Sequence, residues 1–301
     1  YNPVVFKRLT NSWKADELIA AMDAYYPQAE ALLGEQFYFK KNIVKIFTEE
    51  QEVVLWQKKS NEPVGKYLNK EIHREYLSSI VNSSNGAAEV EHSGYVNIAL
   101  FLNLFREYIQ QNNRLIEEAF DYNQLKITTE GIVYKNISAG KIVFCEGYKA
   151  IDNPYFKNLP LKLTKGEVLT IHCEQLQQTD KVINKGVFIL PIGNDLYRVG
   201  ATYEWNDLTE NTTQKGKEEL ITKLKKILKV NFKVIAHDAG IRPTVEHRRP
   251  LLGLHPQHPS LTLFNGLGTK GVMLAPYFAN QLYNCLENNI PVDKEVDIQF
   301  L

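Results

Sequence analysis

Three glycines near the end of the chain form the pattern G-x-G-x-x-G, with Gly266, Gly268 and Gly271 in "NGLGTKG". Glycines at this spacing let the backbone of a strand-to-helix turn approach a phosphate group at the N-terminus of the helix. A dinucleotide-binding turn of this kind opens a βαβ unit and is followed by an acidic residue about 20 positions later. Only 30 residues follow Gly271, so the pattern lies at the wrong end of the chain for a pyrophosphate site.

Two other segments contain histidines whose neighbours could carry chemistry. His255 and His258 lie in "HPQHP", where two prolines and the lack of a neighbouring cysteine or carboxylate favour a surface turn over a metal site. His237 and Asp238 have no serine or cysteine in a nucleophile turn to complete a hydrolase triad. The sequence therefore predicts no metal site and no hydrolase.

The composition is that of a globular protein with one large or two medium domains. The 301 residues are 44% hydrophobic and 23% charged, and Lys+Arg and Asp+Glu are equal at 35 each. A neutral chain has no bulk field to attract nucleic acid or an anionic membrane. The three cysteines contain no C-x-x-C motif, which favours a reducing, cytoplasmic compartment. No apolar run reaches the roughly 18 residues that a membrane span needs.

The first part of the chain predicts one helix followed by short strands. Apolar residues from 13 to 32 recur at helical spacing, and Pro27 is expected to kink or split that helix. Short β-type runs at 37–39, 43–47 and 53–56 then predict an antiparallel meander. A second helix with one wide apolar face begins after Asn97, which can cap its N-terminus.

The second part alternates a buried strand with antiparallel blocks. "KIVFCEG" (141–147) is typical of a strand buried on both faces. Residues 161–173, 186–192 and 196–203 predict antiparallel strands, the last two joined by the turn Gly193-Asn194-Asp195. An amphipathic helix (212–230), a strand that runs into a loop (232–243) and a C-terminal strand and helix complete the chain. Such interleaving indicates two domains joined by several crossings of the chain.

Five segments in order resemble the FAD-dependent oxidoreductases of the D-amino-acid oxidase and glycine oxidase family. They are "SGYVNIALFLNLF", "KIVFCEG", "LKLTKGEVL", "VFILPIGNDLYRVGATYE" and "AGIRPTVEHRRPLLG" followed by "NGLGTKGVMLAP". The resemblance implies an α/β plus α+β fold, in which an incomplete Rossmann-like FAD-binding domain is interleaved with an antiparallel-sheet substrate domain. The expected FAD-binding domain comprises residues 1–35, 93–160 and 256–301, and the expected substrate domain comprises residues 36–92 and 161–255.

The resemblance also implies a role for the C-terminal glycine turn. In this family the turn points a helix N-terminus at the isoalloxazine ring, where backbone N–H groups and the helix dipole stabilise the negative charge of reduced flavin. Glycine allows the backbone to approach the ring closely. The expected cofactor-binding residues are Asn2, Pro3, Cys145, Gly147, Gly266, Gly268, Thr269, Lys270 and Gly271, and the FAD is expected to be non-covalent.

Three residues are expected to act on the substrate. Arg242 in "GIRP" matches the family arginine that pairs with the substrate carboxylate, a role that suits the guanidinium fork; the alternative is a structural arginine paired with Glu246. Lys270 matches the position of a second cation near substrate or flavin in glycine-oxidase-like members, and the alternative is a solvated loop lysine. Tyr203 could face the active site, or be an ordinary core or surface tyrosine. His247 stands where the family usually has Asp, so no role of that Asp is carried over.

The resemblance further implies that an N-terminal βαβ unit of about 30 or more residues is missing. That unit carries the main phosphate-binding turn, so the chain is expected to bind FAD poorly or not at all by itself.

The predicted reaction is the oxidation of an amino acid or N-substituted glycine by hydride transfer to flavin N5, with the substrate carboxylate held by Arg242. Orientation matters more than acid–base catalysis in this chemistry. One alternative is the flavin module of a tRNA-modifying oxidoreductase, whose family has a similar glycine turn, although the neutral charge disfavours a nucleic-acid partner. Another is a flavin-free fragment that acts as a binding module. The substrate side chain, the electron acceptor and the oligomeric state are not predicted.

Overall fold

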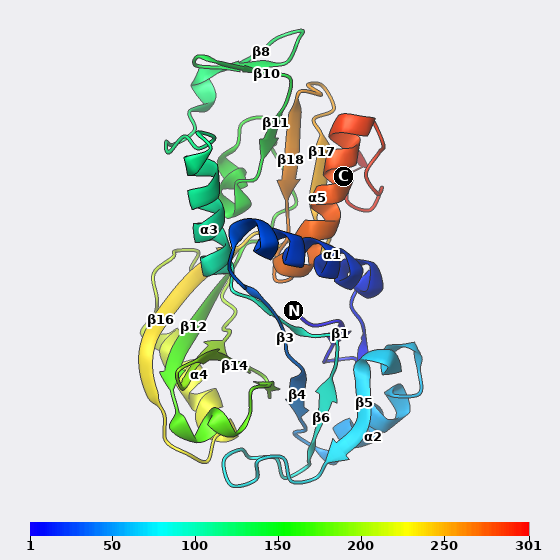
Figure 1. The fold of residues 1–301 in the computed structure, drawn as a ribbon, viewed down its shortest axis with the longest axis vertical. Helices are drawn as coiled ribbons and strands as arrows, with labels where there is room; N and C mark the ends of the chain where they lie inside the picture. Colours follow the sequence, from blue (N-terminus) through cyan, green and yellow to red (C-terminus); the bar gives the residue numbers. More distant parts are fainter. Residues whose placement is uncertain (301) are drawn as a thin grey trace. The chain divides into compact units, whose positions relative to one another are not determined.

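The computed structural model describes residues 1–300. The chain divides into two compact units (Figure 1). Unit 1 comprises Tyr1–Phe101 and Lys165–Gly240, and unit 2 comprises Leu102–Thr164 and Ile241–Leu301. Each unit is thus made of two segments that are distant in the sequence. The assignment of residues to an FAD-binding and a substrate-binding domain is a functional division, and it stays a prediction.

Unit 1 is built around an eight-stranded sheet with the order β16-β12-β15-β14-β13-β4-β6-β5. Its strands are β4 (Ile43–Ile46), β5 (Leu68–His73), β6 (Ala87–Val90), β12 (Thr164–His172), β13 (Val182–Asn184), β14 (Phe188–Gly193), β15 (Leu196–Gly200) and β16 (Lys233–Arg242). β13 and β4 pair in parallel, whereas β12 with β15, β15 with β14, β14 with β13, β4 with β6 and β6 with β5 are antiparallel. The predicted hairpin of β14 and β15 is confirmed, and both residues of its turn, Asn194 and Asp195, have positive φ.

Helix α4 (Gln214–Ile227) packs on this sheet and confirms the predicted amphipathic helix. Its buried residues Leu220, Leu224 and Ile227 follow helical spacing and belong to one core cluster with residues of β4 and β12–β15. The side chain of Thr213 caps its first turn by accepting a hydrogen bond from the N–H of Gly216 at 3.0 Å.

The prediction of a strand at 53–56 is wrong, because these residues lie in helix α2 (Glu50–Lys59). Glutamates occupy the first turn and lysines the last turn of α2, an arrangement that favours a helix through its dipole. Trp56 is fully buried, whereas Val54 is 61% exposed. The apolar run that looked like a strand is therefore split between a buried and an exposed face of a helix.

Helix α1 (Ala15–Leu33) contains Pro27 and runs through it without a break, so the chain is not split there. Met22 and Tyr26, on the turn before Pro27, are buried, so the helix is held against the core where Pro27 removes a backbone hydrogen bond. Two small sheets, β1 (Val4–Val5) with β2 (Thr10–Asn11) and β3 (Tyr38–Lys40) with β7 (Gly94–Val96), complete unit 1.

Helix α3 (Ile98–Gln111) begins where the sequence predicted it. The side chain of Asn97 accepts a hydrogen bond from the N–H of Leu100 at 3.2 Å, which confirms the predicted cap. No side chain of α3 is fully buried within residues 1–300, although one of its faces is apolar.

Unit 2 contains two three-stranded sheets and the last long helix, α5 (Gly271–Asn288). One sheet is the antiparallel meander of β8 (Leu125–Ile127), β9 (Ile132–Tyr134) and β10 (Ile137–Ala139). The other sheet has the order β11 (Ile142–Phe144), β18 (Leu261–Asn265) and β17 (Leu251–Leu254). Strands β11 and β18 are parallel, and β18 and β17 are antiparallel. Phe144, Leu251, Leu261 and Leu263 lie in one core cluster of this unit.

The prediction that the strand in "KIVFCEG" is buried on both faces is wrong in detail. Phe144 is buried, but Val143, which points to the opposite face, is 38% exposed. Alternate residues of a strand point to opposite faces, and only one face of β11 is covered by the described residues. The strand itself and the mixture of α/β with antiparallel sheets are confirmed.

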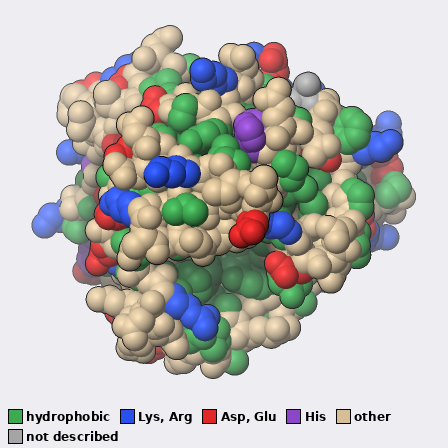
Figure 2. Space-filling view, turned by 90° about the horizontal axis from the view of Figure 1, so that it is seen from above, with side chains coloured by type: hydrophobic (Ala, Val, Ile, Leu, Met, Phe, Trp, Pro, Cys, Tyr) green, Lys and Arg blue, Asp and Glu red, His purple; other side chains and the backbone are tan. Residues whose placement is uncertain are grey.

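Two surface properties bear on partners. No helix within residues 1–300 is long and apolar enough to cross a membrane. On the face drawn in Figure 2, Lys and Arg side chains are interspersed with Asp and Glu, and neither sign forms a continuous patch there.

Candidate functional site

The predicted cofactor-binding residues of unit 2 meet at the carboxyl ends of two adjacent parallel strands. Strands β11 and β18 pair so that Phe144 lies opposite Leu263. The segments that follow the two strands, residues 145–147 and 266–271, therefore leave the sheet at the same edge. In sheets with parallel strands this edge is where ligands bind.

Asn265 joins these two segments. It is the last residue of β18 and is 2% exposed. Its side-chain Nδ2 donates to the carbonyl oxygen of Gly147 at 2.8 Å, and its Oδ1 accepts from the N–H of Gly266 at 2.7 Å. Sequence reasoning missed Asn265, although a polar residue at the end of an apolar strand, directly before the glycine pattern, was a signal for it.

The glycines of the two segments have different physical roles. Gly147, Gly266 and Gly268 all have positive φ, at 59°, 72° and 53°, a region that glycine enters at little cost. A Cβ atom on Gly266 would lie 2.7 Å from a side-chain carbon of Val245 and 3.0 Å from one of Leu251. A Cβ on Gly147 would meet nothing within 4 Å. Gly266 is therefore required for packing, whereas Gly147 faces open space that a ligand can approach.

This contrast predicts the relative cost of two alanine substitutions. Both Gly147→Ala and Gly266→Ala place a Cβ at positive φ, which costs about 1–2 kcal/mol. Gly266→Ala adds the clash with Val245 and should therefore destabilise the protein by about 1–2 kcal/mol more than Gly147→Ala. Urea unfolding of both variants measures this difference. Equal losses of unfolding free energy in the two variants would show that the side chains around Gly266 can move to accommodate the added Cβ.

The N-terminus of α5 is built to receive negative charge. Within the described residues no side chain caps it, and its first turn contains no acidic residue. By contrast α4 is capped by Thr213, whose N–H and hydroxyl are held by Glu167 at 2.8 and 2.7 Å. The first N–H groups of a helix have no intrahelical acceptor, and the helix dipole is positive at this end. The start of α5 therefore places positive potential, with no acidic side chain in its first turn, next to the glycine turn.

Lys270 precedes the first residue of α5 and adds a cation there. The side chain is half-buried, and burial lowers the pKa of Lys270 from 10.5 to about 8. A lysine ammonium at the positive end of a helix is also electrostatically unfavourable. An anion bound at this position would relieve both penalties. The role of Lys270 toward a substrate or a flavin stays a prediction.

Arg242 lies next to the glycine turn. It ends β16, and its Nη1 atom is buried. The N–H of Gly268 donates to the carbonyl oxygen of Pro243 at 3.2 Å, which brings "GIRP" and "GLGTKG" together in unit 2. Glu246, the alternative partner of Arg242, forms an ion pair with Lys162 at 2.7 Å.

Thr244 is a second residue that sequence reasoning missed. Its Oγ1 is buried and makes no hydrogen bond within residues 1–300, and it lies close to Gly268, at 3.9 Å from the Cβ that Gly268 lacks. A buried hydroxyl without a partner is costly, so it indicates a missing donor or acceptor. The sequence offered no signal for Thr244 beyond its place next to "GIRP".

The remaining predicted residues lie elsewhere. Thr269 is exposed in the glycine turn, and Cys145 is exposed after β11. In unit 1, the Asn2 side chain accepts the N–H of Val4 at 2.9 Å, and the Pro3 carbonyl accepts the N–H of Ser12 at 2.7 Å. Their roles toward a cofactor stay predictions.

Tyr203 lies in the loop after β15 of unit 1. It is 55% exposed, and its ring is stacked against that of Trp205 with centroids 6.3 Å apart. Exposure of this kind fits a surface tyrosine as well as one that contacts a substrate, so its catalytic role also stays a prediction.

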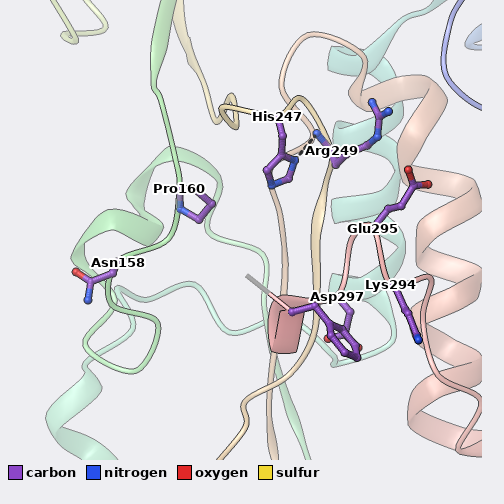
Figure 3. A pocket seen from close by; sticks show the side chains of 8 residues that line it. Asn158, Pro160, His247, Arg249, Lys294, Glu295 and Asp297 are labelled. Atoms are coloured by element: carbon purple, nitrogen blue, oxygen red, sulfur yellow. Dashed lines mark hydrogen bonds between the residues drawn. The ribbon is translucent and has the colours of Figure 1, made fainter.

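Unit 2 also has an open hollow of about 680 Å³ away from these residues (Figure 3). Cationic and anionic side chains share its lining, which consists of Asn158, Pro160, His247, Arg249, Lys294, Glu295, Asp297 and Phe300. His247 Nδ1 accepts the backbone N–H of Arg249 at 3.3 Å, drawn as a dashed line in Figure 3. Opposite charges cancel across this hollow, and none of the predicted site residues lines it.

Comparisons with solved structures define the class of fold. Glycine oxidase from Geobacillus kaustophilus superposes with a TM-score of 0.75 over 92% of this chain and 79% of its own, at 19% identity. Iminodiacetate oxidase from Chelativorans sp. BNC1 gives a TM-score of 0.76 over 97% of this chain and 86% of its own, at 15% identity. At these identities the likeness shows a shared fold, and it confirms the fold class predicted from the sequence.

The family follows from the sequence comparisons. Residues 7–283 match the model of the DAO family, described as FAD dependent oxidoreductase, and the chain belongs to that family. Glycine oxidase of Bacillus subtilis (strain 168) is 28% identical over 153 residues, which are 49% of this chain and 40% of that protein. The match thus spans less than half the length of that relative.

The residues at this edge of unit 2 fit the flavin end of an FAD. Gly147 leaves room for close approach, and the start of α5 supplies positive potential with no acidic residue in its first turn. The buried Oγ1 of Thr244 adds a polar group that lacks a partner among the described residues. These features suit a planar ring that gains negative charge on reduction.

Proposed function

We propose that the protein is a flavin-dependent oxidoreductase that oxidises amines carrying a carboxylate, namely amino acids or N-substituted glycines, with non-covalent FAD. The observation that carries the proposal is the hydrogen bond from the N–H of Gly268 to the carbonyl of Pro243, at 3.2 Å. This bond joins the residue after Arg242 to the glycine turn before α5, and in the proposal the guanidinium of Arg242 lies at the start of that helix. The names of the related proteins, glycine oxidase and iminodiacetate oxidase, support the same substrate class.

In this proposal Arg242 binds the substrate carboxylate. A guanidinium offers two parallel N–H donors that match the two carboxylate oxygens, so it fixes orientation as well as position. Lys270 supplies a second positive charge at the same edge of unit 2. Tyr203 is retained as a proposed substrate contact from unit 1, on the resemblance alone.

The glycine turn and the start of α5 would hold the flavin ring. Bound FAD supplies the acceptor for the two electrons and the hydrogen removed from the substrate carbon. The N–H groups at the start of α5 stabilise negative charge placed next to them, and the glycines admit the ring to the backbone. The protein therefore contributes binding, orientation and electrostatics, which is what this chemistry requires of it.

The test is the spectrum of the purified protein and its response to substrates. A flavin band near 450 nm is expected (about the usual position for flavins), and anaerobic glycine, sarcosine or a D-amino acid should bleach it. Methylamine, which has no carboxylate, is the control and should leave the band unchanged. Bleaching by methylamine as fast as by glycine would contradict the proposed binding of the substrate carboxylate. A colourless full-length protein that takes up no FAD would contradict the proposed cofactor.

A further inference from the structure

The two turns at the candidate site lie beyond the hydrogen-bonded ladder of the sheet. The pairing of β11 with β18 ends at Phe144 opposite Leu263, whereas Gly147 and Gly266 both follow the last paired residues. Past the ladder, the separation of two chain segments is no longer fixed by strand pairing. It depends on whatever bonds join the segments there.

The side chain of Asn265 provides one such bond, to Gly147, and its second bond, from the adjacent Gly266, fixes the orientation of the amide. It connects the carbonyl oxygen of Gly147 at 2.8 Å with the N–H of Gly266 at 2.7 Å, across 118 positions of sequence between Asn265 and Gly147. One amide group thus acts as donor to the first turn and as acceptor from the second. Its 2% exposure leaves no water to replace these bonds.

The hydrogen-bond partners of Asn265 indicate whether its role is only structural or also functional. A buried amide needs hydrogen-bond partners wherever it lies, so burial alone indicates only a contribution to stability. Here both bonds end on the backbone of glycines with positive φ, and Gly147 borders open space. Movement of the Gly147 turn or of the Gly266 turn would change the distance between them. The proposed contacts with the flavin depend on that distance.

We propose that Asn265 is a positioning residue, whose amide sets the separation of the Gly147 and Gly266 turns and thereby the affinity for the flavin. This inference rests on the proposed FAD-dependent function. Asn265 acts through the two glycine turns and needs no contact with the flavin. A small change in the spacing of groups that hold a rigid ring is expected to lower affinity strongly, because the ring cannot adjust.

The experiment compares Asn265→Asp, Asn265→Leu and Thr262→Val in the full-length protein. Asn265→Asp keeps an acceptor for the N–H of Gly266 but at neutral pH places a second oxygen against the carbonyl of Gly147. Asn265→Leu removes both bonds at similar volume. Thr262→Val is the control, because Thr262 is a fully buried residue of the same strand whose hydroxyl makes no hydrogen bond within residues 1–300.

Three quantities are measured: the FAD dissociation constant from flavin fluorescence, the midpoint potential of the bound flavin, and the urea midpoint of the apoprotein. Asn265→Asp should raise the FAD dissociation constant about tenfold or more at pH 7.5, an effect on the scale of one buried hydrogen bond. The constant should recover as the pH falls and the aspartic acid protonates, because the acid can again donate to the carbonyl of Gly147. Thr262→Val should bind FAD like the wild type.

The outcomes separate this inference from the proposed function. Asn265 variants that lose apoprotein stability but keep the wild-type dissociation constant and potential would overturn the positioning role and leave the proposed function intact. Should Asn265→Leu fail to fold, the pH recovery of Asn265→Asp decides the question, and no recovery overturns the inference. A wild-type protein that binds no FAD overturns both.

Discussion

Replacement of Arg242 by alanine should raise KM for glycine-type substrates about 100-fold or more. The guanidinium at the end of β16 is the proposed partner of the substrate carboxylate, and its Nη1 atom is buried. Hydrogen bonds to a charged group contribute about 1.5–3 kcal/mol each, and every 1.4 kcal/mol corresponds to a factor of about ten. Steady-state kinetics with glycine and sarcosine measure the effect, and kcat should fall less than kcat/KM.

Two further variants show whether the rise in KM comes from the lost geometry of the guanidinium or from its lost charge. Arg242→Lys keeps the charge but loses the fork, so KM should lie between those of the wild type and the alanine variant. Arg198→Ala is the control, because that arginine forms an ion pair with Asp238 at 2.5 Å and has no proposed substrate role. An unchanged KM in Arg242→Ala would remove this residue from the site, whatever the control does.

Binding of a simple carboxylate should weaken as the pH rises through about 8, the pKa of Lys270. Burial holds the pKa of Lys270 in the folded protein below the usual lysine value of 10.5, so the ammonium is present at neutral pH and is lost above about pH 8. An anion that prefers the protonated lysine then binds about tenfold more weakly for each pH unit. This decline ends at the higher pKa that Lys270 has in the complex with the anion. With acetate as the probe, the dissociation constant should rise by about 30-fold in total, which corresponds to about 2 kcal/mol of binding free energy.

Titrations of the flavin spectrum with acetate between pH 6.5 and 9.5 measure this dependence, because acetate has no amine to titrate. Lys270→Met should bind acetate weakly at every pH, near the high-pH limit of the wild type. Lys270→Arg should bind well throughout, since arginine keeps its charge. A wild-type profile that stays flat from pH 6.5 to 9.5 would show that this ammonium does not contact the anion.

The sequence predicted those elements whose local signals agree with their packing. Asn97 and the hairpin turn at Asn194 and Asp195 are local chemistry, and both were confirmed. Val53–Trp56 was assigned wrongly, because apolar and β-branched residues side by side fit a strand until the flanking charges are weighed. The exposure of Val143 could not be predicted, since it depends on which segments cover β11.

The candidate site was predicted in part, and the limit has a physical cause. Motifs placed Arg242 and the glycine turn in one site, and the structure brings their neighbours Pro243 and Gly268 into hydrogen-bond contact. Asn265 and Thr244 were missed, because their significance depends on contacts rather than on residue type. A buried asparagine looks like any other polar residue until its two backbone partners are known.

Strand β18 lies between β11 and β17, so both of its edges are hydrogen-bonded. Central strands open less often than edge strands, and their amide hydrogens exchange with solvent most slowly. The glycine turn starts on this protected strand and ends at the start of α5, whose residues Met273 and Phe278 are fully buried. Local opening of unit 2 should therefore reach β11 before it reaches β18, so the Gly147 side of the candidate site should open before the glycine turn that follows β18.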